Sequence, residues 1–288
     1  MDALTYPYEL YLPNVQQWHR ASGPKPRDPE ARFVYVDITS EPLSVLESFK
    51  DLQGVWLRRA ADAHLESLAR FTALSVVRLV EPHITSLTPL KHLPNLQALS
   101  MEDPPVLHGL ETLKNLRCLT MRHFRRIESL SAVAELSELR ALSLSTIPSW
   151  DASRRCLQVE SFEPLRNAVA LESLALMGVW PQDGKLEALL DLAKLKYLHI
   201  SHVFGFSLEQ YAALRRALAG ARGHCLEPYY LLPQLNLHCK RCAEELVFLT
   251  GPRPRTPRQL CPKCHAHKLE EHVRRWNVAL QTAPGTKG

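Results

Sequence analysis

Apolar residues recur along the chain in a fixed order, L-x-x-L-x-L, in which the first, fourth and sixth positions are apolar. The fourth and sixth positions are two residues apart, which is the spacing that places side chains on one face of a β-strand. Each copy therefore predicts a short strand with one apolar face. The copies are Phe33/Val36/Ile38 (the weakest), Leu52/Val55/Leu57, Leu74/Val77/Leu79, Leu96/Leu99/Met101, Leu116/Leu119/Met121, Leu139/Leu142/Leu144, Leu171/Leu174/Leu176 and Leu195/Leu198/Ile200.

Between these copies, apolar residues occupy every third position. One run extends from Ile84 to Leu96 in steps of three, and similar runs cover 107–116 and 127–139. A period of three suits short 3₁₀ turns better than a full α-helix. Successive copies start 19, 22, 22, 20, 23, 32 and 24 residues apart. Units of this length cannot bury an apolar face alone, so the pattern predicts a stacked solenoid with one continuous core.

This combination of strand pattern and period resembles the 22-residue, bacterial-type subclass of the leucine-rich-repeat family, over residues 33–206. The resemblance implies an α/β repeat solenoid, a right-handed array with parallel strands on its concave face. One family position departs from the pattern, because the usual asparagine three residues after the last strand leucine is missing. We expect its role at the turn to pass to water or to irregular loop bonds. The residues that replace it are Ala60, Pro82, Pro104, Phe124, Ile147, Val179 and Val203.

The ends of a solenoid need caps, and the sequence supplies candidates at both ends. Tyr6, Tyr8, Leu10 and Leu12 alternate as in a strand, and a proline-rich linker follows. Near the other end, Ser207-Leu208-Glu209-Gln210 fits a helix capping box. We predict four regions: an N-terminal cap and linker (1–32), the repeats (33–206), a helical cap and connector (207–237), and a ribbon with a terminal helix at 268–280 (238–282).

Four cysteines in this last region form two Cys-x-x-Cys pairs. Cys239 and Cys242 are separated from Cys261 and Cys264 by 18 residues, a spacing typical of zinc sites. Four thiolates complete a tetrahedral shell and leave no open position, so one structural Zn²⁺ is predicted. The segment resembles the zinc-ribbon family, with 246–249 as its strand.

Other uses of these cysteines stay open. Four thiolates also hold iron, a Cys-x-x-Cys pair also serves as a redox dithiol, and His238, His265 or His267 could replace one ligand. The remaining cysteines are Cys118, Cys156 and Cys225, scattered singly. Such usage fits a reducing cytoplasm better than a disulfide framework.

Residues at the x positions of the strands should face the concave side, which is the usual binding surface of repeat proteins. The charges among them alternate in sign, which favours a protein partner over a phosphate backbone. The 32-residue interval adds a tryptophan and two arginines, residue types enriched at interface hot spots. The predicted partner-binding residues are Trp150, Arg154, Arg155, Trp56, Arg122, His123, Tyr197, His199 and Trp180.

Aromatic residues also follow several strands and allow two interpretations. They either line one edge of the solenoid as a binding surface or pack inward at the positions where asparagines are missing, since large aromatics are mostly buried. These residues are Phe124, Trp180, Phe204 and Phe206.

The basic charge is concentrated at the C-terminal end. Residues 238–288 contain ten Lys and Arg against four Asp and Glu, whereas the other 237 residues contain 25 against 26. Arg253, Arg255 and Arg258 lie on a proline-rich loop between the cysteine pairs and could contact phosphates. A nucleic-acid-associated accessory protein is therefore the alternative function.

No glycine-rich phosphate loop, nucleophile elbow or open metal-ligand set is present in the sequence. His199 and His202 could form a pair, which we interpret as surface histidines, and no small-molecule substrate is indicated. The N-terminus lacks a signal-peptide pattern and no stretch of about 18 apolar residues occurs. We expect a cytoplasmic, non-enzymatic protein-interaction module without membrane contact. An immunity protein that neutralises a toxin is one concrete version, by analogy of architecture.

Overall fold

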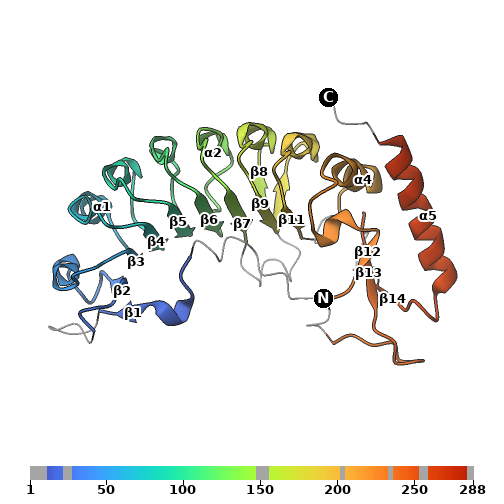
Figure 1. Ribbon diagram of the computed structural model, residues 1–288, viewed down its shortest axis with the longest axis horizontal. Helices are drawn as coiled ribbons and strands as arrows, with labels where there is room; N and C mark the ends of the chain where they lie inside the picture. The colour runs from blue at the N-terminus through green and yellow to red at the C-terminus, as the bar shows by residue number, and fades with distance from the viewer. Residues whose placement is uncertain are drawn as a thin grey trace.

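A nine-stranded parallel sheet dominates the computed structural model, which describes residues 12–21, 28–146, 156–201, 205–232, 236–252 and 259–283. Strands that follow one another in the sequence lie side by side, in the order β1-β2-β3-β4-β5-β6-β7-β9-β11 (Figure 1). This arrangement confirms the α/β repeat solenoid. The strands are β1 (His19–Arg20), β2 (Phe33–Asp37), β3 (Gly54–Arg58), β4 (Val76–Val80), β5 (Ala98–Glu102), β6 (Cys118–Arg122), β7 (Ala141–Ser145), β9 (Ser173–Met177) and β11 (Tyr197–Ile200).

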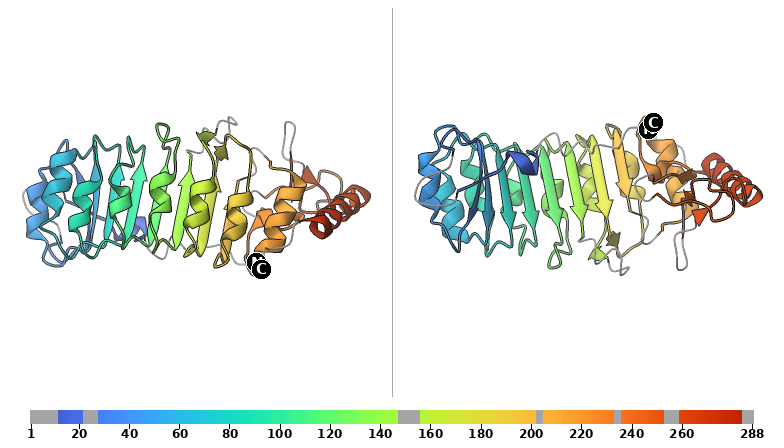
Figure 2. Two further views of the ribbon diagram at one scale, coloured as in Figure 1. Left: turned by 90° about the horizontal axis from the view of Figure 1, so that it is seen from above. Right: turned by 90° about the horizontal axis from the view of Figure 1, so that it is seen from below.

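Short helices cover the outer, convex side of the arc, and the sheet lines its concave side (Figures 1 and 2). Most are 3₁₀ helices, as the period of three predicts; in η4, for example, the N–H of Leu93 donates to the carbonyl of Leu90 at 3.0 Å. Two of the segments are α-helical instead. The convex helices are η3 (Leu43–Ser48), α1 (Asp62–Leu68), η4 (Thr88–His92), η5 (Leu110–Thr112), α2 (Ser131–Ala134), η6 (Glu163–Asn167) and η7 (Glu187–Asp191).

The core lies between the sheet and these helices. Every second strand residue points into it, so Val55 and Leu57 of β3 are fully buried while Trp56 between them faces the concave side. The leucines of the three-residue period close the core from the convex side, as Leu87 and Leu90 do. One continuous cluster of buried apolar residues extends from Ala21 to Trp276.

The turns that follow β3 to β6, where the family's asparagine is missing, share one backbone conformation. The residue after each strand adopts a left-handed conformation, with φ of 58° at Arg59, 49° at Glu81, 51° at Asp103 and 58° at His123. Each of these N–H groups donates to a carbonyl of the next strand, for example from Glu81 to Glu102 at 3.0 Å.

The next residue in each of these turns occupies the asparagine position and is buried: Ala60, Pro82, Pro104 and Phe124. Both prolines have no N–H that would need a partner. In these four turns a regular backbone ladder therefore continues up to the asparagine position, and the role of water there stays a prediction. Ile147 and Val203 lie outside the described residues, and Val179 is part of a strand.

The 32-residue interval contributes a second, two-stranded parallel sheet. Its strands β8 (Leu157–Val159) and β10 (Val179–Pro181) pair in register outside the main sheet. The C-terminal half of the insertion is therefore structured as part of the solenoid wall, because Leu157 and Val159 are buried.

The last repeat is closed by α4 (Leu208–Ala217), which begins with the predicted capping box. The Ser207 hydroxyl accepts from the N–H of Gln210 at 3.2 Å, and the Gln210 side chain accepts from the N–H of Ser207 at 3.0 Å. After α4, Arg222 pairs with β11, and its N–H donates to the carbonyl of Lys196 at 2.8 Å. Because the chain itself occupies this edge, β11 offers little free backbone to another strand.

A C-terminal module then follows, comprising η9 (His224–Leu226), three antiparallel strands and a long helix. The strands are β12 (Tyr229–Tyr230), β13 (Val247–Leu249) and β14 (Gln259–Leu260), and the helix is α5 (Ala266–Thr282). β12 comes from the connector, so the module's sheet takes one strand from the predicted cap region. η2 (Val15–Gln17) is the remaining element, near the N-terminal end.

Helix α5 packs against α4, and contacts along its middle and at its C-terminal end hold it to the cap and connector (Figure 1). Trp276 is buried in the main core, a ring nitrogen of His272 (Nε2) lies 2.8 Å from the carbonyl of Pro228, and Arg216 donates to the carbonyl of Ala283 at 2.6 Å. The module therefore extends the solenoid as a continuous body.

No helix among the described residues is long and apolar enough to cross a membrane.

The buried position of Phe124 leads to a stability prediction. Replacing Phe124, which is 1% exposed, by alanine removes a large side chain from a closely packed site and should cost about 3–5 kcal/mol of unfolding free energy. Val169→Ala, at a site 57% exposed, is the matched control and should change it by less than about 0.5 kcal/mol. Urea denaturation followed by circular dichroism measures both. Equal losses in the two variants would contradict the inward packing of Phe124.

Candidate metal centre and concave binding face

The two Cys-x-x-Cys turns bring four thiols together at the base of α5. Among the described residues, the sulfur atoms of four cysteines all lie within 4.8 Å of one another: Cys239, Cys242, Cys261 and Cys264. The Sγ atoms of Cys242 and Cys261 are 3.4 Å apart, those of Cys242 and Cys264 3.4 Å, and those of Cys239 and Cys264 3.8 Å. Four ligands at about 2.3 Å around a tetrahedral ion would be about 3.8 Å apart. The arrangement is compatible with a metal site.

Backbone groups at each turn stabilise negative charge on sulfur. The N–H of Arg241 points to the sulfur of Cys239 at 3.5 Å, and that of Cys264 points to Cys261 at 3.3 Å. Hydrogen bonds from the backbone N–H groups of Arg241 and Cys242 lower the pKa of the Cys239 thiol to about 6. A left-handed residue, Ala243, completes the first turn. At Cys239 the lowered pKa favours the thiolate that a soft or borderline metal ion binds, whereas the hydrogen bond with the Cys242 thiol raises the pKa of Cys264 to about 12.

The concave face carries an aromatic cluster at its N-terminal end. The ring of Trp56 contacts Tyr35 at 4.9 Å and Trp18 at 5.8 Å between centroids, both edge to face. On its other side, the guanidinium carbon of Arg78 lies 3.9 Å from the centre of the Trp56 ring. The sheet register causes this arrangement, because Tyr35, Trp56 and Arg78 are directly opposite one another on β2, β3 and β4.

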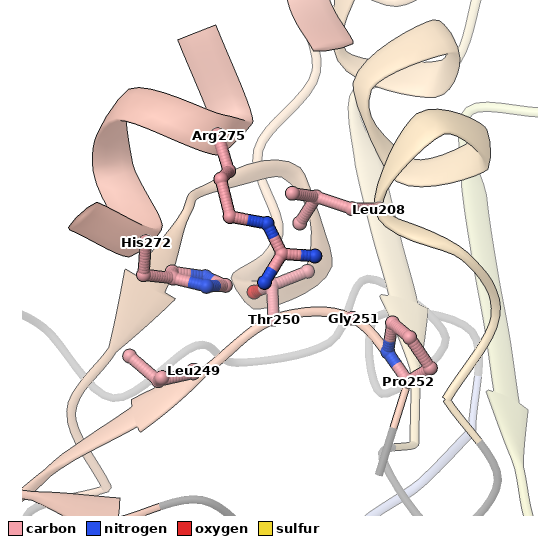
Figure 3. A pocket seen from close by; sticks show the side chains of 7 residues that line it. All are labelled: Leu208, Leu249, Thr250, Gly251, Pro252, His272 and Arg275. Atoms are coloured by element: carbon pink, nitrogen blue, oxygen red, sulfur yellow. The ribbon is translucent and has the colours of Figure 1, made fainter. Parts of the chain in front are cut away.

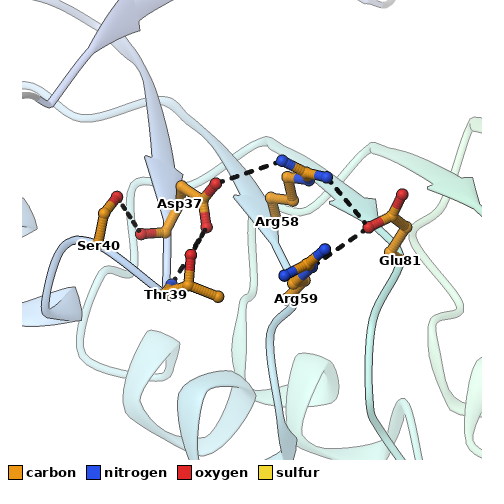
Figure 4. A network of polar contacts seen from close by, with 6 residues as sticks. All are labelled: Asp37, Thr39, Ser40, Arg58, Arg59 and Glu81. Atoms are coloured by element: carbon orange, nitrogen blue, oxygen red, sulfur yellow. Dashed lines mark hydrogen bonds and ion pairs between the residues drawn. The ribbon is translucent and has the colours of Figure 1, made fainter.

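Charged residues at the C-terminal ends of the strands pair with one another along the array (Figure 4). Arg58 lies 3.5 Å from Asp37 and 3.3 Å from Glu81, and Arg59 also reaches Glu81 at 3.3 Å. The next pair is Arg122 with Glu102, at 3.7 Å. The charges of alternating sign that the sequence places along this rim therefore largely neutralise one another through these ion pairs.

The C-terminal end of the concave face combines charges with a small apolar pocket. At the opposite strand ends, Glu172 pairs with Arg140 at 3.6 Å and with Lys196 at 2.6 Å. A pocket beside β11 has a volume of about 40 Å³ and is lined by His199 and His224, among others. Burial lowers the pKa of His224, which favours its neutral form.

A second small cavity, of about 120 Å³, lies between α4, the end of β13 and α5 (Figure 3). The guanidinium of Arg275 and the ring of His272 border it together with Leu208 and Thr250. The Thr250 hydroxyl donates to the carbonyl of Glu227 at 2.6 Å, so this group is already used within the fold. The cavity marks the junction between the cap and the C-terminal module.

The predicted partner-binding residues fall into three groups. Trp56, Tyr197 and His199 lie on concave strands, and Arg122 and His123 at the rim of that face. Trp180 lies on β10, away from the main sheet, and stacks on Phe206 at 4.4 Å. Trp150, Arg154 and Arg155 lie outside the described residues. The same holds for His202 and for the predicted nucleic-acid contacts Arg253, Arg255 and Arg258.

Two of the aromatic residues after the strands clearly pack inward. Phe124 is 1% exposed and Phe206 is 4% exposed. Trp180 is partly buried against the same core. For Phe124 and Phe206 the inward interpretation is confirmed and the exposed aromatic edge is wrong. The binding role of Trp180 stays a prediction, and Phe204 lies outside the described residues.

Sequence reasoning missed the contribution of the segment before the first repeat. Leu12 and Trp18 pack on the concave side against a row of small apolar side chains, and η2 crosses this face in Figure 2. The row consists of the first residues of four strands, Val76, Ala98, Cys118 and Ala141, all buried. The small apolar residues at these x positions were a sequence signal that part of the concave face is covered, because an open concave face would favour polar residues there.

Comparisons with known proteins give structural neighbours only. No family model and no curated protein matches the chain. Among solved structures it is similar to internalin C2 of Listeria monocytogenes, with 20% identity over 54% of this chain and 64% of that chain and a TM-score of 0.37. It is also similar to the leucine-rich-repeat protein LIC12759 of Leptospira interrogans, with 16% identity over 68% of this chain and 55% of that chain and a TM-score of 0.40. A third similar structure is the plant peptide hormone receptor RGFR1 in complex with RGF2, with 14% identity over 57% of this chain and 26% of that chain and a TM-score of 0.37. The chain spans less than two thirds of each of these structures.

The network in Figure 4 predicts a pH dependence of stability. The Thr39 hydroxyl and N–H, together with Arg58, hold the pKa of Asp37 below its ordinary value of 3.8. A carboxyl whose pKa is lowered by folding stabilises the protein above the unfolded pKa, and this contribution is lost as pH falls through the folded value. Asp37→Asn should therefore be less stable than the unmodified chain at pH 7, and the difference should shrink below about pH 4.

Chemical denaturation between pH 7 and pH 3 measures this difference. Because the ion pair is partly solvated, the expected loss at pH 7 is no more than about 1 kcal/mol. Asp51→Asn, at an exposed loop position, is the control and should behave like the unmodified chain at every pH. A gap between Asp37→Asn and the unmodified chain that stays constant down to pH 3 would refute the assignment.

Proposed function

We propose that the chain is a non-enzymatic binding module whose concave face contacts a protein partner and whose C-terminal module is held by one Zn²⁺ on four cysteines. The observation that carries the partner assignment is the aromatic cluster at Trp56. Tryptophan, tyrosine and arginine are the residue types that dominate interface energetics, and here they gather on one rigid sheet.

The charge arrangement supports a protein over a nucleic acid as the partner. Described arginines of the concave rim, such as Arg58, Arg122 and Arg140, each have a carboxylate within 4 Å. A phosphate backbone is bound by cations that release counterions, and cations already paired within the protein contribute less to this effect. A surface of alternating sign instead suits a partner with complementary charges.

The metal assignment is supported by the donor set and its geometry. Cys239, Cys242, Cys261 and Cys264 supply four sulfurs at nearly tetrahedral spacing, which is a closed site. A closed shell leaves no position for substrate, so the ion's role is structural. It would join the turn before β13 to the turn after β14, at the base of α5. Thiolates that must remain reduced to hold the ion fit a cytoplasmic location.

Neutralisation of a toxin in the manner of an immunity protein is a specific version of this function. Its support is the architecture alone, a rigid extended face that can cover part of another protein. A cognate toxin would then be the protein that binds the concave face.

The zinc assignment predicts the metal content of the purified chain. Metal analysis should give about one zinc per chain. Cys264→Ala should abolish it and expose the C-terminal module to proteolysis, because the remaining three ligands no longer close the site. Cys156→Ser, outside the cluster, is the control and should retain the zinc. Iron in place of zinc, or a metal-free chain with unchanged protease resistance, would contradict the assignment.

The partner assignment predicts that matched charge reversals on opposite faces behave differently. Arg122 at the concave rim and Lys91 on the convex η4 are both exposed. A tagged chain with Arg122→Glu should recover at least about tenfold less partner from cells that express it natively, because charge repulsion across an interface costs several kcal/mol. Lys91→Glu should recover as much as the unmodified chain.

Equal recovery by both variants would place the partner elsewhere on the molecule. Recovery that disappears after nuclease treatment would contradict a protein partner and favour the nucleic-acid alternative. Circular dichroism of the two purified variants separates loss of binding from loss of folding.

A further inference from the structure

Trp56 and Arg78 on the concave face have side-chain N–H groups that lack a hydrogen-bond acceptor within the described part of the chain. The indole Nε1 of Trp56 is buried and has no hydrogen-bond partner. Arg78 stacks on the Trp56 ring at 3.9 Å and, within the described part of the chain, has no ion pair or hydrogen bond to its guanidinium. Two strong donors thus lie side by side without an acceptor.

This state is energetically unfavourable and differs from that of the other concave arginines. Burial lowers the pKa of Arg78, and the attraction of Glu102 only partly compensates. Glu102 is itself 3.7 Å from Arg122, so its carboxylate is shared. The buried Trp56 N–H without a partner costs about 1–3 kcal/mol. The guanidinium nitrogens of the half-buried Arg78 are not among the buried atoms that lack a partner, so they remain open to solvent. Stacking on Trp56 holds the guanidinium in place but satisfies none of its N–H groups.

A group that would pair with Arg78 must be an acceptor, and its charge can be inferred from the surroundings. A guanidinium presents its donors in a planar fork that matches a carboxylate. Glu102 is near enough to influence Arg78, and it would repel a dianion more strongly than a monoanion. The aromatic rings of Tyr35 and Trp18 around Trp56 offer apolar contact to the methylene groups of an acidic side chain.

We propose that Trp56 and Arg78 form a carboxylate receptor that binds an aspartate or glutamate side chain of the partner protein. This assignment rests on the proposed function of the concave face. Arg78 provides the charge-assisted hydrogen bonds, and Trp56 provides the surface on which Arg78 is oriented. The buried indole N–H of Trp56 lies beside the site and reports on its occupancy.

The test uses the full chain labelled with ¹⁵N-tryptophan and follows the indole N–H signal of Trp56, which is assigned by its disappearance in Trp56→Phe. The probes are acetyl-Ala-Glu-Ala-amide, the same peptide with glutamine, and inorganic phosphate, all at matched ionic strength. The glutamate peptide should shift the Trp56 signal in a saturable manner, whereas the glutamine peptide should not.

Two variants locate the effect. Arg78→Gln should weaken binding of the glutamate peptide by about tenfold or more, since hydrogen bonds to a charged group are lost. Arg140→Gln, the same substitution at an arginine already paired with Glu172, should leave the affinity within about twofold. Unchanged circular dichroism shows that Arg78→Gln is folded, and Arg78→Lys, which keeps the charge without the planar fork, should also bind more weakly.

Several results would overturn the proposal. These are equal shifts with the glutamate and glutamine peptides, no saturable shift at roughly 30 mM peptide, unchanged affinity in Arg78→Gln, or tighter binding of phosphate than of the glutamate peptide. Failure here is distinguishable from failure of the proposed function. If Arg122→Glu abolishes partner recovery but Arg78→Gln does not, the concave face binds a partner without this receptor. If the peptide binds as expected but no protein is recovered, the receptor stands and the partner assignment falls.

Discussion

The solenoid depends on the parallel ladder of hydrogen bonds between strands of at most five residues. One such strand with its short helix cannot bury an apolar face, so stability comes from the contact of each repeat with its neighbours. The same ladder fixes which side chains meet on the opposite face. A carbonyl before each strand accepts two N–H groups of the next repeat, as Gln53 does from Ser75 and Val76 at 2.8 and 3.1 Å. This repetition keeps Tyr35, Trp56 and Arg78 in one row.

The backbone conformation at the turns follows from the same constraint. The ladder must end where each strand turns toward the convex side, and every N–H there needs an acceptor. Four side-chain-bearing residues adopt a left-handed conformation, which L-residues otherwise avoid, so that their N–H groups stay in the ladder. The side chains of these residues then point to the rim. Arg59 and Glu81 pair there, and the network along the concave edge results from the way in which the fold satisfies its backbone.

The ends of the array are closed in different ways, and this difference places the two candidate sites. At the C-terminal end, Arg222 and α4 cover the last repeat, and α5 with the four-cysteine turns packs on that cap. At the N-terminal end, a two-residue strand and Trp18 cover the first repeat, and Trp18 also contacts Trp56. The metal site thus lies beyond one cap, whereas the aromatic cluster is part of the other.

The sequence by itself determined the repeat, the strands, the short convex helices, the capping box and the four cysteines, because each of these depends on residue type at fixed local spacing. It also indicated which strand residues face the concave side. Only the tertiary structure decided the backbone conformation of the turns that lack the asparagine, since the side chain of a left-handed residue such as Glu81 does not indicate that conformation. Tertiary packing likewise turned Phe124 inward and brought Trp18 onto Trp56, and it left Arg78 stacked without an acceptor. These contacts join residues from different repeats, and local patterns along the chain carry no information about which distant side chain will satisfy a given donor.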